Sequence, residues 1–164
     1  MSLPASPEAV LEAARRKHLR LAAAESCTGG MVSAALTDIP GSSDVLERGF
    51  VTYSNDAKRE MLGVAEATLA AHGAVSPEVA VEMAAGALAH SHADIAVSIT
   101  GIAGPGGSEH KPEGRVCFAI AGAGGDWTET VEFGAPGRAT VRAAAAAHAL
   151  ALLAEAIDRS APKA

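Results

Sequence analysis

The stretch Ala24-Glu25-Ser26-Cys27-Thr28-Gly29-Gly30 decides how this chain can fold. An apolar run over residues 19–24, interrupted by Arg20, precedes it and predicts a buried strand, while residues 31–36 read as the first turns of a helix. The stretch therefore predicts a tight strand-to-helix turn that carries two hydroxyls, a thiol and two glycines. Glycine lets the backbone approach a bound group closely, and a helix N-terminus directs unpaired N–H groups toward an anion.

Such a turn can hold a phosphate, carry a nucleophile or simply cap a helix. Its spacing fits neither the Gly-x-Ser-x-Gly nucleophile turn nor a P-loop, which would continue into Gly-Lys-Ser/Thr. The stretch by itself leaves open whether it is a site or a capping turn without chemistry.

Length and composition predict one domain, with a core over about residues 6–157. The chain has 164 residues, 49% of them apolar, and a net charge of −6, which argues against general nucleic-acid binding. Its two cysteines, Cys27 and Cys117, lie on separate predicted elements, no signal peptide precedes them, and no apolar run approaches membrane-spanning length. We therefore expect a reduced, cytoplasmic protein without a membrane contact. The histidines lack ligand spacing, so neither a metal site nor a cofactor is expected, and His90 and His92 should be solvated.

Helices and strands alternate at first and a hairpin comes late in the chain, which predicts a three-layer α/β/α sandwich with a mostly parallel sheet and an antiparallel edge hairpin. Serines at 6, 54 and 76 are expected to cap helices. The last seven residues are expected to fray, and alanine-rich helix faces favour a homo-oligomer, a dimer or higher. The expected helices span 6–17, 31–38, 55–62, 66–72, 77–90 and 137–157, and the expected strands 19–24, 47–54, 95–100, 115–121 and 127–133.

In such sheets ligands bind at the carboxyl ends of the strands. The loops there are residues 25–30, 53–58 and 101–107, and they hold the unusual residues of the chain. This convergence favours a functional site at the opening stretch.

Four motifs occur in order: Glu25 to Gly30, Gly49-Phe-Val-Thr-Tyr-Ser-Asn-x-x-Lys58, Gly73-Ala-Val-Ser76, and Thr100-Gly-Ile-Ala-Gly-Pro105. Together they closely resemble the CinA C-terminal domain family, over roughly residues 6 to 157. Larger members also carry an N-terminal nucleotide-pyrophosphatase-type domain, and at this length we expect that domain and its activity to be absent.

The resemblance implies a serine amidohydrolase with a lysine base, which converts nicotinamide mononucleotide to nicotinic acid mononucleotide and ammonia in pyridine nucleotide recycling. By resemblance Ser26 is the nucleophile, and Lys58 with Tyr53 handles the proton. The family's substrate-contacting and basic positions correspond to Gly41, Ser42, Ser43, Thr100, Gly101, Arg138 and Arg142.

The chemistry of the residues agrees with these roles. Amide hydrolysis needs a nucleophile, a base and donors for the oxyanion, and the N–H groups of Thr28, Gly29 and Gly30 are candidate donors. No histidine falls in a motif loop, so a Ser-His-Asp triad is not expected. Burial and a helix N-terminus would lower the pKa of Lys58, whereas the alternative is an ordinary solvated lysine.

The roles of the two arginines and of Glu25 stay open. Arg138 and Arg142 are four residues apart on one helical face, which suits a phosphate but also suits solvation or an ion pair. Cys27 is interpreted as a packing residue, and Glu25 as a cap of the turn, a group that orients the base, or an exposed acid.

Two further functions compete with the deamidase. One is a non-catalytic nucleotide-binding or interaction domain linked to competence or DNA damage; the other is an amidohydrolase of a different pyridine or nucleoside amide. The joint presence of Ser26, Tyr53 and Lys58 favours an enzyme, since a binding module does not need all three.

Overall fold

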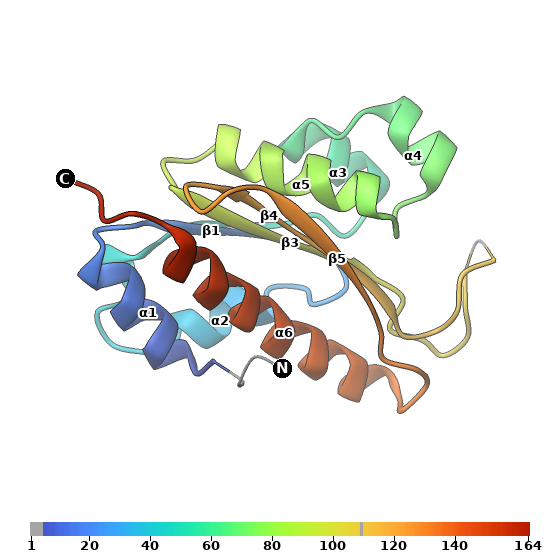
Figure 1. Ribbon diagram of the computed structural model, residues 1–164. Helices are drawn as coiled ribbons and strands as arrows, with labels where there is room; N and C mark the ends of the chain where they lie inside the picture. Colours follow the sequence, from blue (N-terminus) through green and yellow to red (C-terminus); the bar gives the residue numbers. More distant parts are fainter. Residues whose placement is uncertain (1–4, 109) are drawn as a thin grey trace.

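A five-stranded sheet lies between two layers of helices (Figure 1). The structure is a computed structural model that describes residues 5–108 and 110–164. The strand order is β2-β1-β3-β4-β5; β2, β1 and β3 run parallel, and β4 and β5 add to β3 antiparallel. The predicted fold class is therefore confirmed. The strands are β1 (Leu21–Glu25), β2 (Leu46–Val51), β3 (Ile95–Gly101), β4 (Arg115–Gly122) and β5 (Trp127–Glu132).

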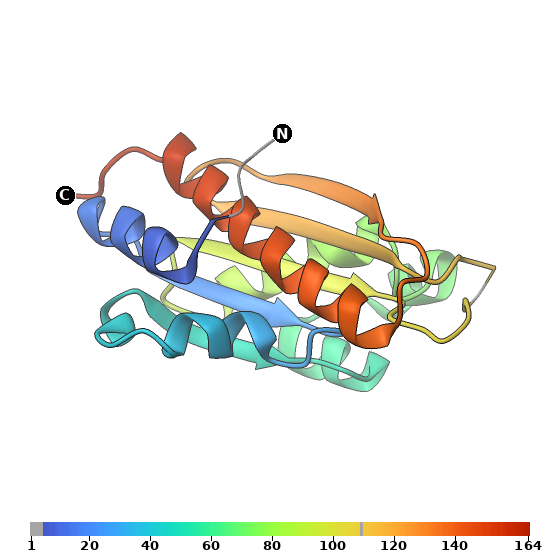
Figure 2. The same cartoon turned by 90° about the horizontal axis from the view of Figure 1, so that it is seen from below.

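Three helices cover each face of the sheet (Figures 1 and 2). One layer holds α1 (Pro7–Arg16), α2 (Met31–Thr37) and α6 (Arg138–Arg159), and the other holds α3 (Asn55–Leu62), α4 (Glu66–His72) and α5 (Pro77–Ala89). A short 3-10 turn, Ser42–Asp44, precedes β2. These bounds agree with the expected helices to within a few residues.

Serine caps start three of the helices, as predicted. The hydroxyls of Ser6, Ser54 and Ser76 accept hydrogen bonds from the backbone N–H three residues later, at 3.1, 3.0 and 3.2 Å. Each bond satisfies an N–H group that the first helical turn leaves without a partner.

Strand β1 is fully buried in the middle of the molecule and packs against both helix layers. Leu21 and Ala23 contribute to the core under α1 and α6, while Ala22 and Ala24 contribute to the core under α3 and α5. This alternation follows from the two-residue period of a strand, and it fixes the direction in which Ser26 leaves the sheet.

Helix α6 is, within the described residues, the one helix whose length and apolar composition would suit a membrane span. Half of its most apolar window is buried, and the helix packs against α1 and β3. This burial is what a core helix shows.

The expected fraying of the last seven residues is wrong. Helix α6 continues to Arg159, and the Lys17 ammonium donates to the carbonyls of Ile157, Asp158 and Ser160 at 2.7, 3.1 and 2.8 Å. Lys163 adds a backbone hydrogen bond to the Lys17 carbonyl and an ion pair with Asp94 at 2.8 Å. A cation at the free carbonyls of a helix C-terminus satisfies those groups, so the tail is fastened to α1.

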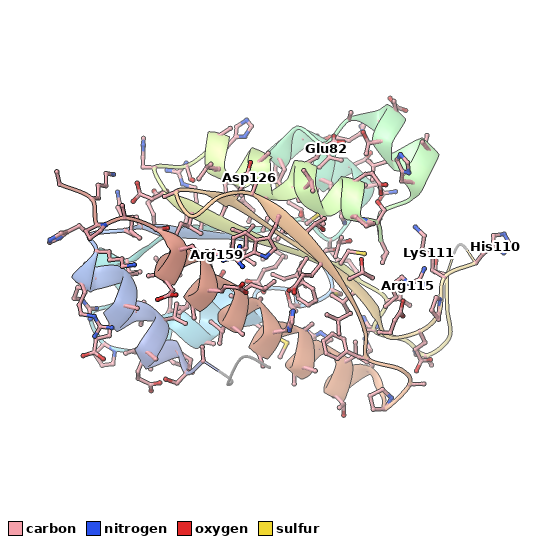
Figure 3. The ribbon with its side chains drawn as sticks, in the orientation of Figure 1. Glu82, His110, Lys111, Arg115, Asp126 and Arg159 are labelled. Carbon is pink, nitrogen blue, oxygen red and sulfur yellow. The ribbon has the colours of Figure 1, made fainter. Side chains whose placement is uncertain are left out.

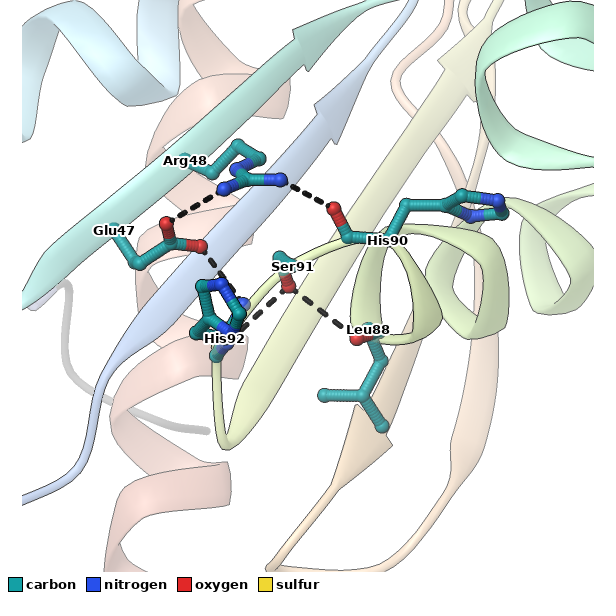
Figure 4. A network of polar contacts seen from close by, with 7 residues as sticks. Glu47, Arg48, Leu88, His90, Ser91 and His92 are labelled. Carbon is teal, nitrogen blue, oxygen red and sulfur yellow. Dashed lines mark hydrogen bonds and ion pairs between the residues drawn. The ribbon is translucent and has the colours of Figure 1, made fainter.

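A network of polar contacts joins the amino end of β2 to the segment that precedes β3 (Figure 4). The Arg48 guanidinium donates to the His90 carbonyl at 2.7 Å, and the Glu47 carboxylate accepts the His92 N–H at 2.9 Å. His90 and His92 are exposed, as predicted. Because the parallel strands share one direction, this network lies at the amino ends of the strands. The loops 25–30, 53–58 and 101–107 lie at the other end of the sheet, where the strands finish.

Candidate active site

The three loops predicted to converge do meet, at the carboxyl edge of β1, β2 and β3, and they line a cavity of about 330 Å³. One contributor lies outside the loops predicted to converge: residues 74–75, between α4 and α5. The described lining consists of Ser26, Cys27, Tyr53, Asn55, Lys58, Ala74, Val75, residues 100–108 and Arg138.

Ser26 and Lys58 form a buried pair at the bottom of this site. Ser26 directly follows β1, and its N–H donates to the Ile99 carbonyl at 2.9 Å, which fixes the residue against β3. Lys58 comes from α3 and is only 1% exposed. Its Nζ lies 3.0 Å from Ser26 Oγ, so the predicted nucleophile and base are in hydrogen-bonding contact.

Burial shifts Lys58 toward its neutral form. Nζ also donates to the carbonyls of Thr52 and Tyr53, at 2.9 and 3.2 Å. Burial lowers the pKa of Lys58 from 10.5 to about 8, because an ammonium loses hydration there. No carboxylate in the described part of the chain forms an ion pair with it. A neutral amine in this position gives two N–H groups to the carbonyls and leaves its lone pair for the Ser26 hydroxyl.

Glu25 caps the turn, one of its three interpretations. Its fully buried carboxylate accepts the Thr28 hydroxyl at 2.7 Å, the N–H groups of Val32 and Ser33 at 2.9 and 3.0 Å, and the Ser33 hydroxyl at 2.8 Å. The exposed-acid interpretation is wrong, and the structure describes no contact of Glu25 with Lys58. The N-terminus of α2 is thus filled by the protein's own carboxylate.

The predicted oxyanion donors lie behind the cavity wall. Thr28, Gly29 and Gly30 are absent from the described lining, and the Gly29 N–H already donates to the Ser26 carbonyl at 3.0 Å. Cys27 does line the cavity. The Cys27 N–H could have been predicted as an oxyanion donor from the sequence, because the amide of the residue after a nucleophile commonly binds the oxyanion. Burial raises the pKa of the Cys27 thiol to about 11, so the side chain packs rather than reacts, in line with its interpretation.

Tyr53 and Arg138 bridge the mouth of the cavity. The Arg138 guanidinium donates to the Tyr53 hydroxyl at 2.9 Å and to the Gly104 carbonyl at 2.7 Å. Tyr53 is 62% exposed, and it meets Lys58 through its backbone carbonyl rather than its hydroxyl. A direct proton transfer between Tyr53 and Lys58 therefore stays a prediction.

The remaining predicted residues divide into two groups. Thr100 and Gly101 line the cavity, and the Thr100 hydroxyl donates to the Ala74 carbonyl at 2.8 Å. Arg142 donates to two carbonyls of the Ser26 turn and is not in the described lining. Substrate contacts by Gly41, Ser42 and Ser43 also stay a prediction, because these residues lie before β2 at the amino edge of the sheet, outside the lining.

Lys111 connects the long loop after β3, whose first residues line the cavity, to residues 72–75 (Lys111 is labelled in Figure 3). Its Nζ donates to the carbonyls of His72 and Val75 at 2.5 and 2.6 Å. The sequence places residues 101–107 of this loop at the carboxyl end of a strand but gives no signal for Lys111, because nothing in it pairs residue 111 with residues 72–75.

The charge of the cavity is positive. Its described lining contains the cations Lys58 and Arg138 and no Asp or Glu. This asymmetry suits an anionic ligand even though the whole chain carries a net charge of −6.

Comparisons with known proteins agree with this geometry. The family model of the CinA C-terminal domain matches residues 5–157. A relative from Escherichia coli (strain K12), named nicotinamide-nucleotide amidohydrolase PncC, is 55% identical over 147 residues, which are 89% of either chain.

Solved structures are similar over almost the whole chain. The competence/damage inducible protein CihA from Agrobacterium tumefaciens is 48% identical with a TM-score of 0.81, covering 93% of this chain and 97% of that one. A competence-damaged protein (CinA) superfamily protein from Klebsiella pneumoniae 700603 is 39% identical with a TM-score of 0.86, covering 94% and 98%. The chain belongs to the CinA C-terminal domain family.

Proposed function

We propose that this protein is an amidohydrolase that converts nicotinamide mononucleotide and water to nicotinic acid mononucleotide and ammonia. The observation that carries the proposal is the buried contact of 3.0 Å between Lys58 Nζ and Ser26 Oγ, inside a cavity whose described lining contains no carboxylate. The 55% identity to the E. coli enzyme named as a nicotinamide-nucleotide amidohydrolase supports the choice of substrate.

The first half of the reaction forms an acyl-enzyme. Neutral Lys58 accepts the Ser26 proton while Oγ attacks the carboxamide carbon, and the C=O electron pair moves onto oxygen. The Cys27 N–H is the proposed donor to that oxyanion. Re-formation of the C=O bond then breaks the C–N bond, and the leaving nitrogen takes the proton from Lys58 and departs as ammonia.

The second half hydrolyses the ester. Lys58, neutral again, accepts a proton from water as the water oxygen attacks the acyl carbon. The C–Oγ bond breaks, Ser26 recovers its proton from Lys58, and the carboxylic acid product leaves. Serine and lysine thus supply nucleophile, base and acid, and we propose that neither a metal ion nor a cofactor takes part.

Arg138 is the proposed phosphate contact. It is the exposed cation at the mouth of the cavity, and its guanidinium fork matches phosphate geometry. A bound phosphate would compete with the Tyr53 hydroxyl and the Gly104 carbonyl for the same N–H groups. We also place the reaction in the cytoplasm, where its nucleotide substrate would be found.

The test is ammonia release from nicotinamide mononucleotide by the wild type and by Ser26→Ala, with a metal chelator present. Nicotinamide, nicotinamide riboside and the dinucleotide serve as parallel substrates. We expect release by the wild type alone and from the mononucleotide above all.

Three other results would each replace part of the proposal. Activity that survives in Ser26→Ala would place the nucleophile elsewhere. Release from another amide only would leave the chemistry and change the substrate. Mononucleotide binding without release would support the non-catalytic binding domain.

A further inference from the structure

Arg142 contacts the backbone of the Ser26 turn rather than the cavity. Its Nε donates to the Cys27 carbonyl at 3.0 Å and its Nη2 to the Thr28 carbonyl at 3.3 Å. The side chain is partly buried and reaches the turn from the first turns of α6. Arg138, four residues earlier on the same helix, lines the cavity instead.

These two hydrogen bonds orient the peptide groups of the turn. In a trans peptide the C=O and the N–H point in opposite directions. With its carbonyl held by Arg142, the peptide between Thr28 and Gly29 directs its N–H away from the guanidinium, and that N–H donates to the Ser26 carbonyl at 3.0 Å. The Ser26 carbonyl is thereby held as well, so the Cys27 N–H points to the other side of its peptide, and no backbone carbonyl of the described residues accepts it.

The opposite side of the turn is held by Glu25, whose carboxylate binds the Thr28 hydroxyl and the first N–H groups of α2. Gly29 lies between the two supports with a φ of +58°, and a Cβ there would be 3.4 Å from Arg142 Nη2. The turn is therefore confined on both sides, and Arg142 is the part of this arrangement that comes from a distant segment of the chain.

We propose that Arg142 is a positioning residue: it fixes the backbone of the Ser26 turn so that Oγ faces Lys58 and the Cys27 N–H is available to the oxyanion. It does not bind the substrate phosphate. The proposal rests on the proposed function, because it assigns Arg142 a part in the same reaction.

Steady-state kinetics separate positioning from phosphate binding, with Arg138→Ala as the matched control on the same helix. A misplaced nucleophile costs about 100-fold in rate, so Arg142→Ala should lower kcat by about 10- to 100-fold and change KM for the mononucleotide less than about threefold. Arg138→Ala should instead raise KM, by about 10- to 100-fold if one charged hydrogen bond is lost.

A conservative variant provides the rescue. Arg142→Lys keeps the charge but replaces a two-point fork by one flexible donor, so it should recover only part of kcat. Guanidinium ion, added well below denaturing concentrations, should raise kcat of Arg142→Ala toward the wild-type value and leave Arg138→Ala unchanged. If Arg142→Ala does not fold, Arg142→Lys carries the same comparison.

A second readout does not depend on the substrate. An arylsulfonyl fluoride reacts with an activated serine: the Oγ–S bond forms, the S–F bond breaks, and the serine proton leaves with fluoride through Lys58. We expect labelling of wild-type Ser26 by mass spectrometry, none in Ser26→Ala, and at least about tenfold slower labelling in Arg142→Ala.

The outcomes distinguish the two proposals. If wild-type Ser26 is not labelled and no ammonia is released, the proposed function fails. Suppose instead that the wild type is active. Arg142 is then not a positioning residue if Arg142→Ala is labelled at the wild-type rate, or if its KM rises while its kcat stays at the wild-type value.

Discussion

At the scale of single residues, Lys58 shows how burial serves chemistry at a cost to stability. A lysine with the usual pKa of about 10.4 is almost never neutral at pH 7, whereas burial brings the pKa of Lys58 to about 8. Burial achieves this by keeping water from the amine, and in the described part of the chain no carboxylate forms an ion pair with it. The same desolvation disfavours the folded state whenever Lys58 is protonated.

Activity should therefore follow the neutral amine. We expect kcat/KM to rise about tenfold per pH unit below pH 8 and to level off above it, because only neutral Lys58 accepts the serine proton. Lys58→Met, close in shape, should lose about 10²- to 10⁴-fold in kcat above pH 8, where the wild-type amine is neutral, and less at lower pH. A pH profile that is flat between pH 6 and 9 would exclude Lys58 as the base.

Stability should depend on pH through the same group. The pKa is lower in the folded state than in the unfolded chain, so the penalty is complete below pH 8 and disappears above the unfolded value of 10.5. Relative to Lys58→Met, the wild type should gain about 1 kcal/mol in free energy of unfolding between pH 7 and pH 9. Urea denaturation of both proteins at the two pH values measures this difference, and a constant difference would contradict it.

The roles of some site residues could be predicted from the sequence, whereas others depend on contacts that form only in the folded chain. The Ser26–Lys58 contact was predicted because motif resemblance and the rule for strand carboxyl ends gave the same answer. The direction of the Arg142 side chain was not predicted. The spacing of Arg138 and Arg142 shows that they share a helix face, but it does not show which one reaches the cavity and which one reaches the backbone of the Ser26 turn. The role of Glu25 stayed open for the same reason: its acceptors, Val32 and Ser33, become neighbours only once α2 has formed.

At the scale of elements, the contact between α3 and α5 holds Lys58 in place. A Cβ on Gly86 of α5 would lie 1.9 Å from the Leu62 carbonyl oxygen at the end of α3. The absence of a side chain at Gly86 is what lets the two helices come so close. The predicted serine caps at Ser54 and Ser76 located the starts of both helices, but the close spacing of the helices depends on tertiary packing that no cap reveals.

Gly86→Ala should therefore destabilise the protein although alanine is the better helix former. The gain of about 1 kcal/mol in helix propensity is outweighed by the clash, and we expect a net loss of about 2 kcal/mol in the free energy of unfolding. A shift of α3 should also lower kcat through Lys58.

The matched control is Ala85→Gly, at an exposed position of the same helix. It should lose about 1 kcal/mol from propensity alone and keep full activity. Urea denaturation and ammonia release compare the two variants, and a more stable Gly86→Ala protein would contradict the close approach.

At the scale of the whole molecule, the C-terminal tail connects the last helix to the first. The last seven residues, 158–164, were predicted to fray because chain ends usually do. The three carbonyl acceptors of Lys17 belong to residues about 140 positions later, a relation that local sequence rules do not detect.

Removing the Lys17 ammonium should test this connection. Lys17→Met leaves the carbonyls of Ile157, Asp158 and Ser160 without their donor, and we expect a loss of about 2 kcal/mol in free energy of unfolding with unchanged kcat. Arg16→Met, its exposed neighbour without a described polar contact, should be neutral. Equal melting temperatures for the two variants would show that the tail contributes nothing.

Association of several chains stays a prediction. Apolar side chains remain exposed at the edge formed by β2 and α3, with Val51 at 49% and Met61 at 41%, and unpaired strand edges favour association. Light scattering of the purified protein should give a mass of at least two chains, and Met61→Glu should reduce it. A single-chain mass at high concentration would exclude the homo-oligomer.

The position of β1 has a consequence for the order in which the chain folds. The hairpin β4–β5 pairs residues that are near in sequence, whereas Leu21 must pair with Leu46 on one side and Ile95 on the other. Pairings across long loops form late because the loop entropy must be overcome first. Ser26 leaves from the end of β1, so refolding chains should acquire the fluorescence of Trp127, on β5, before they regain enzymatic turnover.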